Sequence, residues 1–114
     1  MLTTLLTVGL LVCGTNAAHS APKPELWGYG VRSCADYLRA YEATESAKPT
    51  DYQRYEDWLT GFISGLNLAL GEDVLNGSGI TAAMERAREH CEGNPGDDFF
   101  TATMGLVRQL SSLR

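Results

Sequence analysis

Two cysteines, Cys34 and Cys91, constrain the fold of this chain more than any other feature. A third cysteine, Cys13, belongs to an uncharged apolar run at the N-terminus, whereas every charged residue follows position 20. Once that run is removed, an even number of cysteines remains, and such a pair in an exported chain predicts one disulfide. The bond would close a loop of about 58 residues, which corresponds to roughly 4 kcal/mol of stabilisation through loop-closure entropy.

Residues 1–20 are predicted to be a cleaved signal peptide. The apolar run over residues 1–13 is shorter than the roughly 20 residues that a membrane-spanning helix needs, so we expect no permanent membrane anchor. Ala18 and Ser20 are small residues suited to a cleavage site after Ser20. Val12 does not suit the position before a lipid-modified cysteine, so we expect Cys13 to leave with the signal rather than to anchor a lipoprotein.

The length and charge of the chain exclude several classes of protein. Its 114 residues suffice for one small domain with a single core. The formal net charge is −5, and no basic cluster is present. Nucleic-acid binding depends on basic residues that neutralise phosphates, so nucleic acid is not an expected partner.

The hydrophobic pattern after the signal predicts an all-α fold, a small four-helix orthogonal bundle with the disulfide Cys34–Cys91. Residues 21–32 are rich in proline and glycine and are expected to form an irregular N-terminal arm; a single helical domain then covers 33–112. The first helix is expected from an N-cap at Ser33 to near Ala47, and the second from Thr50 to Leu70. The third is expected from Ser78 or Thr81 to Cys91, and the fourth opens at Asn94-Pro95.

The second predicted helix is the longest and the most apolar. Between Trp58 and Leu70 its only polar residues are Thr60, Ser64 and Asn67, so we expect a central helix covered on more than one side. The third helix is expected to carry an outer charged face of Glu85, Arg86, Arg88 and Glu89.

No motif predicts catalysis, a metal or a cofactor. His90 lies beside Cys91, but that cysteine is assigned to the disulfide, and neighbouring side chains diverge on a helix. The two cysteines lack the spacing of a zinc site. The acidic pairs 56–57, 72–73 and 97–98 also diverge and are interpreted as solvated surface charge. The sequence therefore indicates a protein that is not an enzyme, with a protein as its partner.

Five residues of the second helix are candidates for packing or for an interface: Trp58, Gly61, Phe62, Gly65 and Asn67. Gly61 and Gly65 form a G-x-x-x-G pattern, and each glycine costs the helix roughly 1 kcal/mol relative to alanine. Close packing against another helix of the chain is the first interpretation, and contact with a second protomer is the alternative. Asn67 is expected to be a buried amide bonded to backbone groups, with a partner contact as the alternative.

Three short motifs together resemble the HdeA/HdeB family of small periplasmic helical proteins. They are C-A-D-Y-L over 34–38, W-x-x-G-F-x-x-G over 58–65 and C-x-x-N-P-x-x-x-F over 91–99. The resemblance implies a periplasmic location and an acid-activated holdase chaperone, a dimer near neutral pH that binds unfolded clients through apolar surface when acidified. Protonation of the carboxylates would change the net charge from −5 toward about +10, which favours such opening.

An alternative resemblance is to the Tai-type immunity proteins of type VI secretion, which are also small, exported and helical. It implies a periplasmic interaction or inhibitor module that binds one specific effector. A structural envelope protein is a third possibility. Suppression of aggregation at low pH or a tight one-to-one complex would distinguish the first two.

Overall fold

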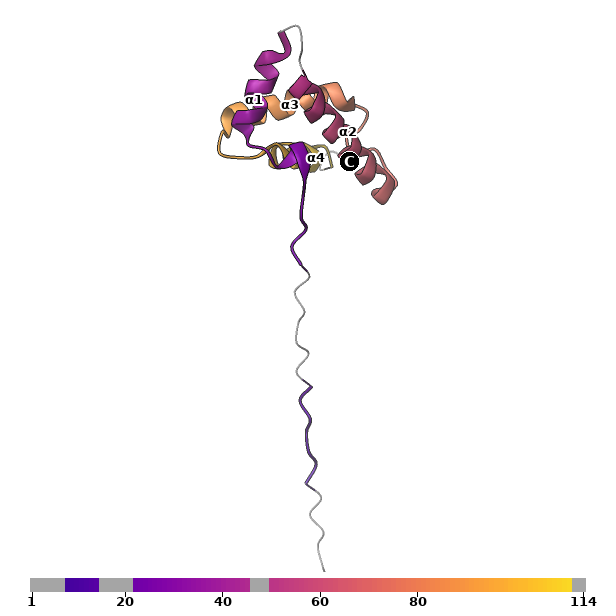
Figure 1. The fold of residues 1–114 in the computed structure, drawn as a ribbon. Helices are drawn as coiled ribbons and strands as arrows, with labels where there is room; N and C mark the ends of the chain where they lie inside the picture. The colour runs from indigo at the N-terminus through magenta and orange to yellow at the C-terminus, as the bar shows by residue number, and fades with distance from the viewer. Residues whose placement is uncertain (1–7, 15–21, 46–49, 112–114) are drawn as a thin grey trace, which may run out of the picture.

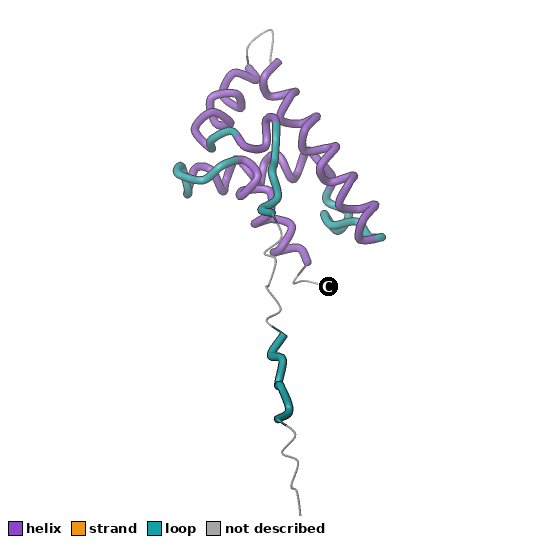
Figure 2. Tube along the Cα trace, turned by 60° about the horizontal axis from the view of Figure 1, so that its bottom comes forward, coloured by secondary structure: helices purple, strands orange, loops and turns teal. Residues whose placement is uncertain are grey.

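The computed structural model describes residues 8–14, 22–45 and 50–111. Within these residues the chain forms four α-helices that pack together and cross one another, as Figure 1 shows. They are α1 (Cys34–Glu42), α2 (Thr50–Leu70), α3 (Gly79–Gly93) and α4 (Phe99–Ser111). Two 3₁₀ turns, η1 (Gly28–Val31) and η2 (Ala43–Glu45), precede and follow α1. The described part contains no strand, so the all-α prediction is confirmed (Figure 2).

The predicted disulfide is present and joins the first turn of α1 to the last turns of α3. Cys34 and Cys91 are both fully buried, and their Cα atoms lie 5.0 Å apart. A short backbone contact adds to this junction, since the amide of Cys34 donates to the carbonyl of Asp97 at 2.8 Å. The amide of Phe99 likewise donates to the carbonyl of Arg32 at 3.0 Å. The start of α1, the end of α3 and the start of α4 are therefore fixed at one place.

The core combines an aromatic cluster with the small and aliphatic side chains of α3 and α4. The rings of Tyr37, Tyr55 and Phe99 meet pairwise with centroids 4.6–5.1 Å apart, within the range of favourable aromatic contacts. All three side chains are buried. Other buried residues include Leu59, Ile63, Val74, Met84, Ala87, Leu106 and Val107.

Two predicted helix boundaries are wrong. The first helix ends at Glu42 and passes into η2, rather than continuing to Ala47, which lies outside the described residues. The last helix begins at Phe99, not at Asn94-Pro95. There the amide of Asp97 donates to the carbonyl of Asn94 in a turn, and the carboxylate of Asp98 accepts the amide of Thr101 as an N-terminal cap.

The prediction that α2 is covered on more than one side is also wrong. Its buried residues are Tyr55, Leu59 and Ile63, which recur every four positions and so form one stripe. Leu68 is 86% exposed and Leu70 is 61% exposed. Figure 2 shows α2 as a long helix at the edge of the helical domain.

The N-terminal residues are described only in part. Of the predicted signal peptide over 1–20, the structure describes 8–14, which form neither helix nor strand. No helix among the described residues has the length and apolar character that crossing a bilayer requires. Signal cleavage and the fate of Cys13 stay predictions.

Candidate functional site

Trp58 on α2 holds the N-terminal arm, the segment before α1, against this helix. The indole Nε1 of Trp58 donates to the carbonyl of Trp27 at 2.9 Å. Gly30 lies flat against the same indole, because a Cβ at this position would overlap the six-membered ring. Gly28 adopts a φ of 84°, a conformation that favours glycine. The arm is therefore held by contacts that need these residue types, and residues 28–31 form η1.

Stacked aromatic rings form the next layer. Trp58 and Phe62, one helical turn apart on α2, stack with centroids 5.1 Å apart and planes inclined by 13°. Phe62 meets the edge of Phe100 from α4 at 5.6 Å, and Trp58 meets Phe99 at 5.9 Å. Because both rings are also packed against the core, their positions are fixed by contacts within the chain.

An open groove of about 510 Å³ lies between the arm and α2, next to these rings. Its surface is mostly apolar, and Trp27 on the arm is 75% exposed. Two carboxylate residues, one on the arm and one on α2, also line it. The full set is Glu25, Leu26, Trp27, Asp57, Trp58, Gly61 and Phe62, which we call the α2 groove.

The expectation that Gly61 and Gly65 pack against another helix of this chain is wrong. Both are exposed, and a Cβ at either position would meet nothing within 4 Å. Gly61 is two positions from both Leu59 and Ile63, or about 200° around the helix, so it faces away from the buried stripe. Gly65 follows one turn later on the same side. The alternative, contact with a second protomer, stays a prediction.

Asn67 has the structural role that was expected. Its side-chain oxygen accepts the amide of Val74 at 2.8 Å, and the Asn67 side chain is half-buried. Its backbone carbonyl accepts the amide of Gly71, also at 2.8 Å. These bonds turn the chain after α2 and hold Val74 and Leu75 in the core. Asn67 therefore shapes the loop after α2 and does not line the α2 groove.

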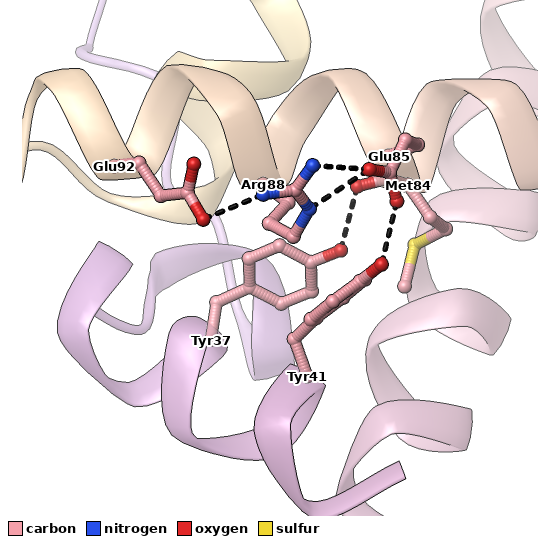
Figure 3. A network of polar contacts seen from close by, with 6 residues as sticks. All are labelled: Tyr37, Tyr41, Met84, Glu85, Arg88 and Glu92. Carbon is pink, nitrogen blue, oxygen red and sulfur yellow. Dashed lines mark hydrogen bonds and ion pairs between the residues drawn. The ribbon is translucent and has the colours of Figure 1, made fainter. Parts of the chain in front are cut away.

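The charged residues of α3 are not all on an outer face, as Figure 3 shows. Glu85 accepts hydrogen bonds from the Tyr41 hydroxyl at 2.7 Å and from Nε of Arg88 at 2.9 Å. Arg88 also pairs with Glu92. These hydrogen bonds, first that of Arg88 and then that of Tyr41, lower the pKa of Glu85. The hydrophobic periodicity of the sequence did not predict this link between α1 and α3. Tyr41 lies at a position of α1 that an apolar residue could equally occupy, so its hydrogen bond leaves no mark on the pattern.

His90, the histidine beside Cys91, pairs with Asp97. Its Nε2 lies 2.7 Å from Oδ2 of Asp97. Its neighbour Cys91 is in the disulfide. Among the described residues no three histidine, cysteine or acidic side chains gather where a metal ion could bind.

The described residues form a small protein of four helices, with one disulfide and an apolar groove beside α2. Comparison with family models, curated proteins and solved structures finds no match for this chain. The likeness to HdeA/HdeB proteins consists of the three motifs given above, and no family is assigned.

Proposed function

We propose that this protein binds another protein through the α2 groove, in an oxidising compartment such as the periplasm. The observation that carries the proposal is the exposed glycine Gly61 in an apolar groove. Alanine would fit there without contact to any other segment that the structure describes and would favour the helix by roughly 1 kcal/mol. A partner backbone that approaches α2 closely supplies a reason for glycine that the isolated chain does not.

The surroundings of Gly61 suit a protein partner. Trp27 and Trp58 line the groove, and tryptophan is one of the residue types enriched among the energetically dominant residues of protein interfaces. Leu68 lies seven positions after Gly61 and therefore on the same side of the helix, where it extends the apolar surface. Exposed apolar surface of this kind is typical of interaction sites.

Of the functions expected from the sequence, an interaction or inhibitor module with a defined partner is the better supported. The α2 groove is open in the folded state, and its rings are already locked by stacking. Binding thus requires no unfolding of the domain, and a preformed surface limits the entropy cost of association. The disulfide supports the oxidising compartment.

Site-specific crosslinking tests this proposal. A photoreactive amino acid placed at position 61 in the full chain is expected to crosslink one discrete partner in the cells that produce the protein. The control position is Ala82, which is exposed on α3 and does not line the groove. Equal crosslinking from 61 and 82, or none from 61, would contradict the proposed site.

The acid-activated holdase is a second candidate, favoured by the way carboxylates hold the folded state. Asp73 accepts the amides of Leu75 at 3.0 Å and Gly77 at 2.7 Å, in the loop that carries the buried Val74. Carboxylates that accept hydrogen bonds in the folded state must be protonated in acid, which favours opening of the domain.

The holdase function has its own test. At pH 2 to 3 the purified protein should bind a hydrophobic dye and suppress aggregation of an acid-denatured client protein. A lack of suppression at several-fold molar excess would exclude the holdase and would leave the proposal for the α2 groove untouched.

A further inference from the structure

The α2 groove is lined by two carboxylates and by no basic residue. Glu25 belongs to the arm and Asp57 to α2, so the two sides of the groove each carry one negative charge. Both residues are exposed, and neither forms a hydrogen bond or an ion pair with any residue that the structure describes. Lys23, the nearest basic residue along the arm, does not line the groove. The groove therefore combines apolar surface with negative charge that the described part of the chain does not compensate.

Trp27 places an uncovered indole beside these carboxylates. Its backbone is held, because its carbonyl accepts the indole N–H of Trp58, yet the residue is 75% exposed. Among the described residues its ring contacts no other aromatic ring and no guanidinium. Elsewhere in the domain a guanidinium does cover a ring, since Arg32 lies 4.0 Å from the ring centroid of Tyr29. Tryptophan attracts cations more strongly than tyrosine does, so Trp27 offers a cation from outside the chain a favourable site.

The charge of the groove argues against a second copy of this chain as its occupant. In a contact with two-fold symmetry both copies present the same surface. Glu25 and Asp57 of one copy would then meet the same two carboxylates of the other, and neither groove would bring a basic residue. Each chain also carries a formal net charge of −5. Like charges that face each other across an interface disfavour association, so the groove suits a partner of opposite charge.

We propose that the α2 groove binds an apolar segment of another protein that carries arginine. The proposal rests on the function proposed above and names the chemistry of the partner. A guanidinium can bind a carboxylate with two hydrogen bonds and can also lie flat on an indole, whereas a lysine ammonium is a point charge without that geometry. One arginine side chain therefore suits Trp27 together with Glu25 or Asp57. Apolar side chains beside it would cover the remaining surface of the groove, where Gly61 permits close approach.

A titration with model peptides tests the proposal. The probes are capped pentapeptides that alternate leucine with arginine, with glutamine or with glutamate, so that only the charge and shape of the polar side chains differ. Amide and indole chemical shifts of the full chain report binding. We expect saturable changes around Trp27 and Gly61 with the arginine peptide, which should bind about fivefold more tightly than the glutamine peptide. The glutamate peptide should not saturate. Added salt should weaken the arginine peptide alone.

Variants of the groove identify which residues cause the preference. The double variant Glu25→Gln, Asp57→Asn should bind the arginine and glutamine peptides equally. Trp27→Leu keeps an apolar side chain and should reduce the preference for arginine. Glu89→Gln is the matched control, because Glu89 is exposed on α3 and does not line the groove. All the substituted side chains are exposed, so the variants should keep the fold, which circular dichroism checks.

Three results of the titration would overturn the proposal: equal affinity for the arginine and glutamine peptides, binding of the glutamate peptide at least as tight, or an unchanged preference in the double variant. Shifts of the groove residues that depend on protein concentration without peptide would also overturn it, because a second copy would then be the occupant. The crosslink from position 61 decides the proposed function separately. A discrete crosslinked partner without any preference for arginine would refute the chemistry assigned to the partner and leave the binding site standing.

Discussion

At the residue scale, the buried tyrosines Tyr37 and Tyr55 differ in the hydrogen bonding of their hydroxyl groups. The Tyr37 hydroxyl donates to the carbonyl of Met84 at 2.7 Å and links α1 to α3 (Figure 3). The Tyr55 hydroxyl has no such bond among the described residues. Tyr37→Phe should therefore lower the free energy of unfolding by about 1 kcal/mol. Tyr55→Phe should leave it unchanged or raise it, because the substitution removes an unsatisfied polar group. Urea unfolding followed by circular dichroism measures both, and equal losses would contradict this account of Tyr55.

Replacing either of two glycines, Gly30 and Gly61, by alanine should change the stability of the domain in opposite directions. In Gly30→Ala the new Cβ overlaps the Trp58 indole, and overpacking of this kind costs about 1–3 kcal/mol. In Gly61→Ala the Cβ meets no atom, and the helix gains roughly 1 kcal/mol. Thermal unfolding of the two variants beside the unmodified chain tests this. A loss of stability in Gly61→Ala would show packing at that position that the structure does not contain.

At the element scale, local chemistry in the sequence predicts some helix boundaries well. Ser33 caps α1 as expected, since its hydroxyl oxygen accepts the amide of Asp36 at 3.1 Å, and α2 spans the predicted residues. The start of α4 was missed because Asn94-Pro95 is an equally good helix start. The choice between them depends on the backbone contact of residues 32–34 with 97–99, which is distant in sequence. Hydrophobic periodicity also could not show that Gly61 and Gly65 on α2 have no neighbouring segment among the described residues.

Glu85 connects α1 and α3 in a way that should make stability depend on pH. Its hydrogen bonds lower its pKa in the folded state below the ordinary value of 4.5. The stabilisation is thus complete above about pH 4.5 and is lost as the pH falls through the lowered pKa. In Glu85→Gln the loss of stability on acidification should be smaller than in the unmodified chain. Denaturant midpoints measured from pH 6 to pH 3 provide the test.

Glu89→Gln is the matched control for this titration, because it removes the same charge from an exposed position of α3. It should keep the pH dependence of the unmodified chain. Identical curves for both variants would show that the contacts of Glu85 do not carry the acid response.

At the scale of the whole molecule, the disulfide holds together elements that are 57 residues apart in sequence. Replacing Cys34 and Cys91 by alanine should lower the free energy of unfolding by about 4 kcal/mol, because the unfolded chain regains the entropy of the open loop. Ala82→Ser is the control, since Ala82 is exposed on α3 and belongs to the helical domain. Equal stability of the double variant and the control would contradict the structural role of the bond.

The disulfide and the helical class could be predicted from the sequence because each rests on one or two residue properties, cysteine parity and helical periodicity. The α2 groove could not. It needs the arm and α2 to meet through Gly30 and Trp58. Contacts of this kind form between segments that are distant in sequence, and local sequence patterns do not predict them.

The central claim is that Gly61 leaves room for a partner, and one variant tests it with two measurements. In Gly61→Leu the account predicts that the free energy of unfolding stays the same or rises, while the affinity for the partner found by crosslinking falls at least tenfold. Ala82→Leu should change neither. An affinity that is unchanged in Gly61→Leu, or one that falls only because the domain unfolds, would contradict the account.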